Sequence, residues 1–235
     1  MITATQDLLF TEEEAQFKAL IKDLMNRPDW PSRDELLNLL ELPKDFYTEV
    51  PKFGNFLELW KLREAYICDY SFALPCQEAL QIIKKYSPIV EVGAGSGFWA
   101  YILSKIGCDI IATDKNLDKI HNVHQTKPWP RYVEILQMGA SEAINKYPDR
   151  NILCCWPDYN DEWSSNFLNL VKNQTVIYIG EFRGCTADEK FHDLLDKAFE
   201  LVEESPIPQW YGVHDRLFIY KRKRQTLAFR KNRRS

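Results

Sequence analysis

The sequence PIVEVGAGSGFWAYIL, residues 88–103, places three glycines at alternate positions directly after a short apolar run. The run PIVEV has the composition of a buried strand, and GFWAYILSKIG has that of a helix. A glycine turn between a strand and a helix lets a ligand approach the backbone closely, and the helix N-terminus favours anionic groups. The stretch therefore predicts a nucleotide-like cofactor on the turn that contains Gly93, Gly95 and Gly97.

Strand-like and helix-like segments alternate after this turn. Further strands are predicted at 108–114, 132–138, 151–156 and 174–181, and further helices at 140–147, 161–172 and 186–199. Five strands that alternate with helices indicate a parallel, doubly wound α/β sheet. Two last strands, at 199–207 and 215–223, are joined by a short segment and predict a hairpin that adds an antiparallel edge.

The first seventy residues show helical rather than strand-like patterns. Thr11 with Glu14, and Ser32 with Glu35, have the spacing of capping boxes, as do Thr186 and Glu189 further along. Apolar residues recur at helical spacing after each of the first two boxes, and a third helix is predicted within 55–70. We expect a helical N-terminal extension or cap at 1–70, an α/β domain at 71–222 and a basic tail at 223–235.

Composition and charge narrow the class of protein. The chain has 235 residues, of which 45% are hydrophobic, which fits one folded α/β domain with an extension. The six cysteines form no metal-binding spacing, and neither a signal peptide nor a membrane span is visible, so we expect a cytoplasmic protein without membrane contact.

The basic residues are unevenly distributed. The last fifteen residues hold eight Lys or Arg and no acid, so the preceding 220 carry 22 basic against 34 acidic groups. Such a tail suggests contact with phosphates of a nucleic acid, or docking onto the protein itself; a solvated chain end is the simpler interpretation.

The spacing of the glycines separates two kinds of cofactor. The dinucleotide fingerprint G-x-G-x-x-G would have Phe98 in place of its third glycine, where a bulky ring obstructs close helix–strand packing. The spacing actually present, E-x-G-x-G-x-G, resembles the first motif of the class I S-adenosylmethionine-dependent methyltransferases. The resemblance covers about residues 70–222. It implies a Rossmann-like, seven-stranded sheet whose last strand runs antiparallel, with S-adenosyl-L-methionine as the cofactor.

The resemblance also implies roles for individual residues. The glycines would meet the amino-acid part of the cofactor, with the preceding acid near its ammonium group. An acid at the end of the second strand would bind both ribose hydroxyls, although the same spacing would also serve NAD. The adenine would contact the backbone of Met138 or Gly139, or the hydroxyl of Ser141. The cofactor-binding residues expected are therefore Glu91, Gly93, Gly95, Gly97, Asp114 and Met138.

The segment CCWPDYNDEW, residues 154–163, follows the fourth strand and is expected to line the acceptor site. It is partly similar to the [N/D/S]-P-P-[Y/F] motif of amino-group methyltransferases, because Pro157 and Tyr159 remain while Trp156 and Asp158 depart from it. A histidine beside an acid can act as a general base near neutral pH. The candidate catalytic residues are Asp158, Tyr159, Glu181 and His214; a turn or cap role for Asp158 and a structural loop role for His214 stay open.

Three functions remain. The first is methyl transfer to an unidentified acceptor, expected to be a small molecule. The second is methylation of an amino group on an RNA or DNA base, with the basic tail contacting phosphates. The third is a non-catalytic module that only binds the cofactor. WPDY, GEFRGCTADE and PQWYGVHDRL also resemble blocks of a poorly characterised, bacterial-type branch of this methyltransferase superfamily, which carries no acceptor over to this chain.

Overall fold

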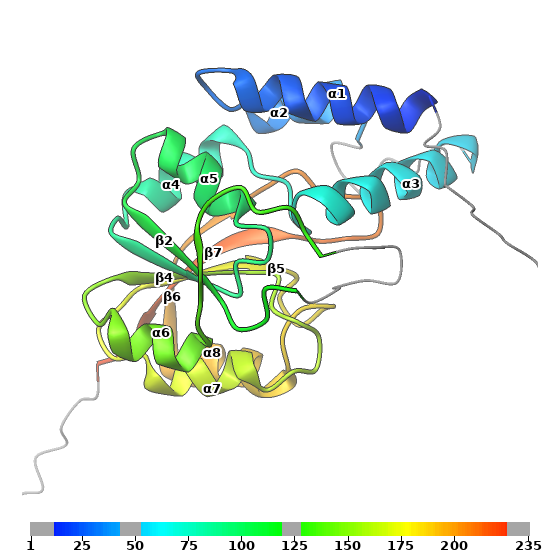
Figure 1. Ribbon diagram of the computed structural model, residues 1–235. Helices are drawn as coiled ribbons and strands as arrows, with labels where there is room; N and C mark the ends of the chain where they lie inside the picture. The colour runs from blue at the N-terminus through cyan, green and yellow to red at the C-terminus, as the bar shows by residue number, and fades with distance from the viewer. Residues whose placement is uncertain (1–11, 43–52, 119–127, 225–235) are drawn as a thin grey trace, which may run out of the picture.

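A seven-stranded sheet forms the centre of the molecule in the computed structural model, which describes residues 12–42, 53–118 and 128–224 (Figure 1). The strands follow the order β3-β2-β1-β4-β5-β7-β6 across the sheet. Their bounds are β1 (Ile89–Val92), β2 (Ile110–Asp114), β3 (Ile135–Gln137), β4 (Asn151–Cys155), β5 (Val176–Gly180), β6 (Phe199–Pro206) and β7 (Arg216–Arg222). The first five are parallel, and β7 runs antiparallel to both β5 and β6. The predicted fold class is confirmed.

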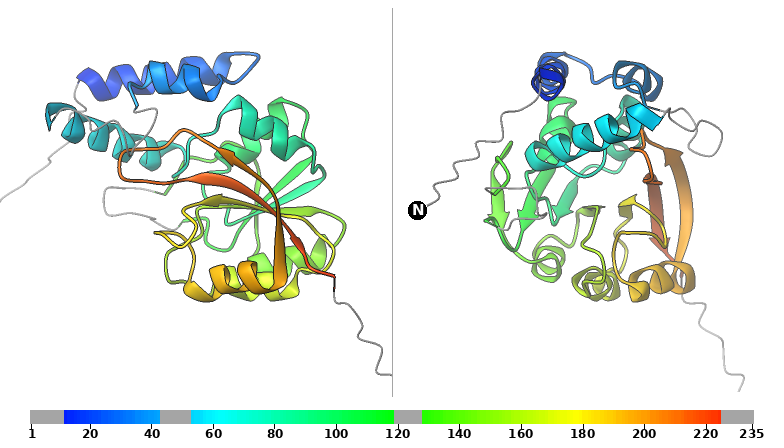
Figure 2. Two further views of the ribbon diagram at one scale, coloured as in Figure 1. Left: turned by 180° about the vertical axis from the view of Figure 1, so that it is seen from behind. Right: turned by 90° about the vertical axis from the view of Figure 1, so that its right-hand side faces the viewer.

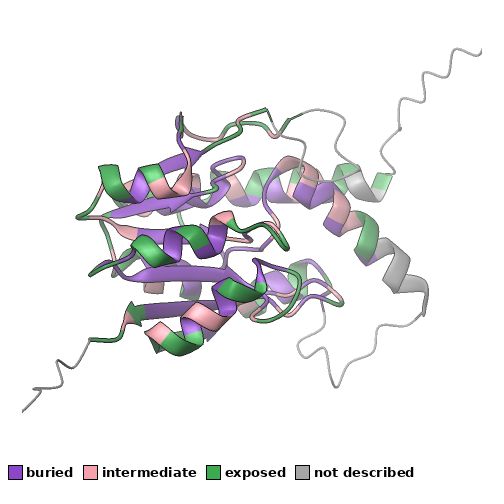
Figure 3. Cartoon of the chain, turned by 90° about the horizontal axis from the view of Figure 1, so that it is seen from below, coloured by how far each residue is buried: buried purple, intermediate pink, exposed green. Residues whose placement is uncertain are grey.

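Helices cover both faces of the sheet, which is why β1 and β5 are buried along their whole length and are apolar apart from Glu91 of β1. The helices are α1 (Glu12–Asn26), α2 (Arg33–Leu39), α3 (Phe53–Asp69), α4 (Gln77–Lys84), α5 (Phe98–Lys105), α6 (Ala140–Lys146), α7 (Trp163–Leu170) and α8 (Glu189–Ala198). The first five lie on one side of the sheet and α6, α7 and α8 on the other (Figure 2). Figure 3 shows the exposed outer faces of the surface helices around the buried strands. The sequence pattern did not predict α4. No helix in the described ranges is both long and apolar enough to cross a membrane.

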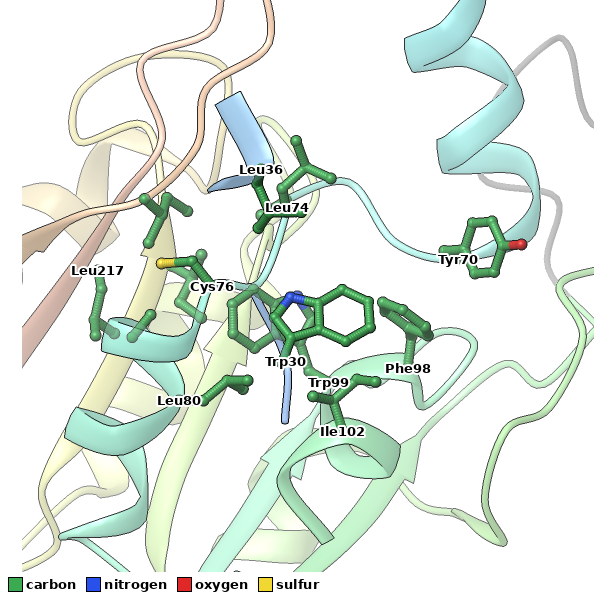
Figure 4. Packing of buried hydrophobic residues seen from close by; sticks show 14 of the residues in the cluster. Trp30, Leu36, Tyr70, Leu74, Cys76, Leu80, Phe98, Trp99, Ile102 and Leu217 are labelled. Carbon is green, nitrogen blue, oxygen red and sulfur yellow. The ribbon is translucent and has the colours of Figure 1, made fainter. Parts of the chain in front are cut away.

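The N-terminal helices share one apolar core with the sheet. Ile21 of α1, Leu36 of α2 and Tyr66 of α3 are fully buried in the cluster that also contains Ile89 of β1. Trp30, between α1 and α2, donates from its indole to the carbonyl of Pro75 at 2.7 Å and packs edge-on against Phe98, 5.9 Å between ring centres (Figure 4). The division at residue 70 therefore stays a prediction, and no packing boundary accompanies it in the described residues.

The three predicted capping boxes differ in outcome. Ser32 caps α2 and accepts a hydrogen bond from the amide of Glu35 at 3.2 Å, as predicted. The prediction at Thr186 is wrong, because Asp188 caps α8 by accepting from the amide of Phe191. The Thr186 hydroxyl instead donates to the carbonyl of Glu181 at 2.9 Å. The first box includes Thr11, which lies outside the described residues.

The first residues of the basic tail bind helix ends of the same molecule. The Arg222 guanidinium donates to the carbonyls of Leu168 and Val171, at the end of α7. The Lys223 ammonium donates to the carbonyls of Asp196 and Lys197, at the end of α8. Cations at helix C-termini satisfy unpaired carbonyls and complement the helix dipole. Self-docking therefore holds for these two residues, while 225–235 lie outside the described part of the chain.

The shared core predicts that the N-terminal helices unfold together with the sheet. We expect Ile21→Ala to lower the free energy of unfolding by about 2–5 kcal/mol, because it removes a fully buried side chain. Urea unfolding followed by far-UV circular dichroism should show one transition, moved to lower urea. Leu39→Ala is the control, since Leu39 is 40% exposed in the same extension. A separate early transition with an unmoved main one would contradict the shared core.

Candidate functional site

A cleft opens where the carboxyl ends of β1, β2 and β4 meet, and it encloses about 970 Å³, including the solvent at its mouth. Its walls come from the glycine turn, the end of β2, the start of α6, the segment after β4 and the segment before α4. Parallel α/β sheets bind ligands at this edge. The cleft joins segments far apart in sequence, including both the predicted cofactor residues and the predicted acceptor segment.

All three glycines of the turn have left-handed backbone conformations, with φ of +66° at Gly93, +57° at Gly95 and +71° at Gly97. Their missing side chains leave room for other parts of this chain. A Cβ atom would lie 3.0 Å from the Trp163 ring at Gly93 and 2.2 Å from the Trp129 ring at Gly95. At Gly97 it would lie 2.7 Å from Val133. Only Gly93 of the three lines the cleft. The glycines are therefore required for packing within the chain, independently of any contact with a cofactor.

Asp114 ends β2 and holds the turn in place. Its two carboxylate oxygens accept hydrogen bonds from the amides of Gly95 and Asn116, each at 2.9 Å. The side chain is buried and lines the cleft. A carboxylate offers about four lone-pair positions, so each oxygen keeps the capacity to accept a further hydrogen bond from a ligand.

Glu91, within β1, is a buried acid facing the cleft. It is 1% exposed, and no described residue donates a hydrogen bond to its Oε2 atom. Burial raises the pKa of Glu91 to about 8, and the nearby charge of Asp114 adds to the rise. The backbone amide of Ala100 donates to the carboxyl group and opposes the rise. A buried carboxyl oxygen without a donor, as Oε2 is, is rare in native proteins and indicates a place for a ligand donor or cation.

The segment expected to contact adenine is placed only in part at the cleft. Met138 is buried in the apolar core below α6 and α7, and its amide donates to the carbonyl of Asp114 at 2.8 Å. Gly139 and Ala140, directly after it, line the cleft. The lining does not include Ser141. Backbone at Gly139 and Ala140 is thus better placed than Met138 to contact a bound ring.

The segment after β4 forms the other end of the cleft. Asp158 lines it and accepts a hydrogen bond from the Trp163 indole at 3.2 Å. Trp156 also lines it, in a left-handed conformation with φ of +50°, and stacks on Phe72 with 4.9 Å between ring centres. Tyr159 is 63% exposed and is not part of the lining, so the structure does not bring it to the other candidate residues.

Glu181 and His214 pair with each other behind the cleft. The Glu181 Oε1 atom accepts from the His214 amide at 2.6 Å and lies 3.2 Å from His214 Nδ1, while Oε2 accepts from the Cys185 amide. Neither residue lines the cleft. The pair holds the segment before β7 against the end of β5, a structural role that accounts for both side chains.

Asp215 follows His214 in the sequence and connects the segment before β7 to Trp156 through a hydrogen bond. It is fully buried and accepts from the Trp156 indole at 2.7 Å. Burial raises its pKa to about 8, against the hydrogen bond from Trp156, with Glu181 adding to the rise. The buried Arg63 of α3 contacts the same ring, its guanidinium 5.8 Å from the Trp156 ring centre.

Sequence reasoning missed Trp129, Phe72 and Arg63. Trp129 has the one visible signal, because it stands between two prolines in KPWPR, residues 127–131, where an exposed tryptophan would be unusual. Its indole donates to the carbonyl of Ile67 in α3, which connects the extension to the glycine turn. Phe72 and Arg63 carry no sequence signal, since their neighbours in space come from other elements.

The raised pKa of Asp215 predicts a pH-dependent stability. Its folded pKa of about 8 exceeds the ordinary unfolded value of about 4, so the folded state retains a proton that the unfolded state has lost between those values. Stability therefore falls as pH rises through this window. We expect Asp215→Asn, which can still accept from Trp156, to reduce the fall of the unfolding free energy between pH 5 and pH 8.

Urea unfolding at several pH values measures this effect. Glu91 contributes in the same direction, so the variant should keep part of the slope. Exposed Asp29, changed to Asn, is the control and should leave the slope unchanged. Equal slopes for Asp215→Asn and the unmodified protein would contradict a raised pKa at Asp215.

No family model matches the sequence, and no curated protein is similar to it in sequence. Similar solved structures include TrmN from Thermus thermophilus, with 15% identity over 62% of this chain and 48% of that one and a TM-score of 0.41. The chain thus spans about half the length of TrmN.

Two smaller proteins are matched more completely. The CcbJ methyltransferase from Streptomyces caelestis is 12% identical over 62% of this chain and 94% of that one, with a TM-score of 0.39. The glycopeptide N-methyltransferase MtfA, complexed with S-adenosyl-L-homocysteine, is 12% identical over 74% of this chain and 99% of that one, with a TM-score of 0.39. The strand order, the antiparallel β7 and the glycine turn after β1 agree with the Rossmann-like, seven-stranded sheet that the sequence resemblance implies.

Proposed function

We propose that this chain binds S-adenosyl-L-methionine in the cleft and transfers its methyl group to a small-molecule acceptor. The observation that carries the proposal is the convergence of Glu91 and Asp114 on the two sides of Gly93 in one cleft. Glu91 has a buried carboxyl oxygen, Oε2, without a described donor, which suits an ammonium group. Asp114, which binds the turn, has acceptor capacity for a sugar diol.

The residues present fit this cofactor. Asp114 would accept from the ribose hydroxyls with the capacity that the turn leaves, and Glu91 would face the ammonium group. Backbone at Gly139 and Ala140 would contact the adenine. When bound, the cofactor supplies an electrophilic methyl group on a sulfonium centre. The contribution of the protein is then to orient the acceptor and to accept its proton.

The structure supports this cofactor over NAD. Phe98 occupies the third position of the dinucleotide fingerprint, and it is fully buried against Trp30 and Tyr132. A glycine is needed at that position for close packing at the pyrophosphate. The core of this chain uses the same position for an aromatic ring.

The extent of the cleft supports an enzyme over a module that only binds the cofactor. Asp158 and Trp156 of the acceptor segment line the same cleft as Glu91 and Asp114, so polar and aromatic groups for a second ligand adjoin the cofactor residues. The nucleic-acid alternative rested on the basic tail. Arg222 and Lys223 are committed to helix ends, and no described residue of the tail faces the cleft.

The first test of the proposal is calorimetric titration with S-adenosylmethionine, with NAD as the comparison ligand. We expect binding of the first and none of the second. Asp114→Ala should weaken binding about tenfold to a hundredfold, from the loss of hydrogen bonds to a charged group. Asp118→Ala is the matched control, because Asp118 lies on the same loop and its side chain is 88% exposed. Unchanged affinity in Asp114→Ala would place the cofactor elsewhere.

The raised pKa of Glu91 allows a second, independent test. Near pH 7 the free protein holds a proton on Glu91, and a bound ammonium group favours its release. Calorimetry in two buffers of different ionisation enthalpy should therefore show more proton release per bound cofactor in the unmodified protein than in Glu91→Gln. The Gln variant corrects for protons exchanged by the cofactor itself. Equal proton release in both proteins would remove Glu91 from the site.

A further inference from the structure

Three aromatic side chains of the cleft lining contact one another, and we call them the aromatic wall: Phe72, Trp129 and Trp156. Phe72 stacks on Trp156 at an interplanar angle of 12°, and the Trp129 ring stands edge-on to Phe72 with 5.6 Å between ring centres. These rings come from three separate segments of the chain, and their mutual contacts fix their orientation. A flat apolar group would find a preformed surface here.

The indole N–H groups of Trp129, Trp156 and Trp163 are already used within the protein, whereas that of Trp99, which also lines the cleft, has no partner among the described residues. Trp156 donates to Asp215, Trp129 to the carbonyl of Ile67, and Trp163 to Asp158. The rings therefore present carbon surface to the cleft and offer no indole donor to a ligand. An anionic acceptor would lose its hydration here without gaining hydrogen bonds from the rings, whereas aromatic faces attract cations.

The cleft lining beside Trp156 carries two carboxylates, while the guanidinium of Arg63 contacts the Trp156 ring without lining the cleft. Asp158 and Asp161 both line the cleft, and each accepts a hydrogen bond from Trp163, Asp158 from the indole and Asp161 from the amide. Lys115 is the single basic residue in the described lining, and it follows Asp114 at the opposite end. Carboxylates with fixed positions beside an aromatic wall suit a protonated amine.

We propose that the methyl acceptor is a small molecule carrying a primary or secondary amine on an aromatic or other flat apolar body. The body packs on the aromatic wall, and the amine contacts the carboxylate of Asp158. This inference rests on the proposed function, since it assigns the acceptor of the same cleft. Nucleic acids are disfavoured as acceptors, because their phosphates would approach the carboxylates of Asp158 and Asp161 in the cleft lining.

The chemistry assigns Asp158 two tasks. It attracts the ammonium form, and it takes the proton that the nitrogen must lose, passing it on to water. The freed lone pair forms the new N–C bond while the C–S bond of the cofactor breaks and its electron pair stays on sulfur. Asp158 is fixed for this role by the Trp163 indole, whose ring edge rests against Gly93 of the turn.

Direct titration of amines tests the inference without the cofactor. The probes are 2-phenylethylamine and tryptamine, each compared with its carboxylate analogue, 3-phenylpropanoate and 3-indolepropanoate, and with 2-phenylethanol as a neutral analogue. We expect at least one amine to bind about tenfold or more tightly than its carboxylate analogue and than the alcohol. Carboxylates that bind as well as the amines would overturn the inference, as would the absence of binding by either amine.

Asp158→Asn separates the role of the charge from that of the fold, because an asparagine oxygen can still accept from Trp163. This variant should weaken amine binding about tenfold or more and leave binding of S-adenosylmethionine unchanged. Asp149→Asn, an exposed residue just before β4 at the opposite edge of the sheet, is the matched control and should bind amines normally. Amine binding that Asp158→Asn retains in full would overturn the assignment.

Transfer of a tritiated methyl group completes the experiment. We expect label on the bound amine and none on unmodified transfer RNA or on single-stranded DNA. Label on nucleic acid in preference to the amines would overturn the inference while supporting methyl transfer itself. Selective amine binding without any binding of S-adenosylmethionine would instead contradict the proposed function and leave the amine site in place. The two failures are thus distinguishable.

Discussion

The space left by three missing Cβ atoms determines how the cleft is built. Gly95 accommodates the ring of Trp129 and Gly93 the ring edge of Trp163, while Gly97 accommodates Val133. The turn therefore holds the segments after β2 and β4 against itself. Through the Trp163 indole it also orients Asp158, at the other end of the cleft. One short turn thus positions both the cofactor residues and the acceptor residues, because all of them pack on the same backbone.

Trp156 is the second point on which the cleft depends. A bulky residue in the left-handed region costs about 1–2 kcal/mol, so contacts elsewhere must stabilise it. Those contacts come from Phe72 in the segment before α4, Arg63 in the extension and Asp215 just before β7. The N-terminal helices therefore help to build the acceptor end of the cleft, in addition to covering the sheet. That role explains why they share its core.

The sequence was sufficient for the sheet, the glycine turn and Asp114, because each depends on a local pattern of a strand, a turn and a helix. It was insufficient where position depends on contacts between distant segments. Glu181 and His214 were expected at the rim of the cleft, yet the segment before β7 folds over the end of β5, where the buried Glu181 pairs with the partly exposed His214 outside the cleft lining. Thr186 had the spacing of a cap, but Asp188 lies closer to the first turn of α8 and takes that place. Trp129 and Phe72 reach the cleft only through contacts with segments that are far from them in the sequence.

Two buried carboxyl groups, Glu91 and Asp215, have nearly the same raised pKa of about 8 but different access to ligands. Asp215 is closed off by the Trp156 ring, which uses its indole to bind the carboxylate, so its proton responds to folding. Glu91 lines the cleft, and a cation that enters can replace its proton. A cleft in which a ligand cation takes over from a proton changes its net charge little on binding. This favours cationic ligands at the Glu91 end for the same electrostatic reason that Asp158 favours an amine at the other.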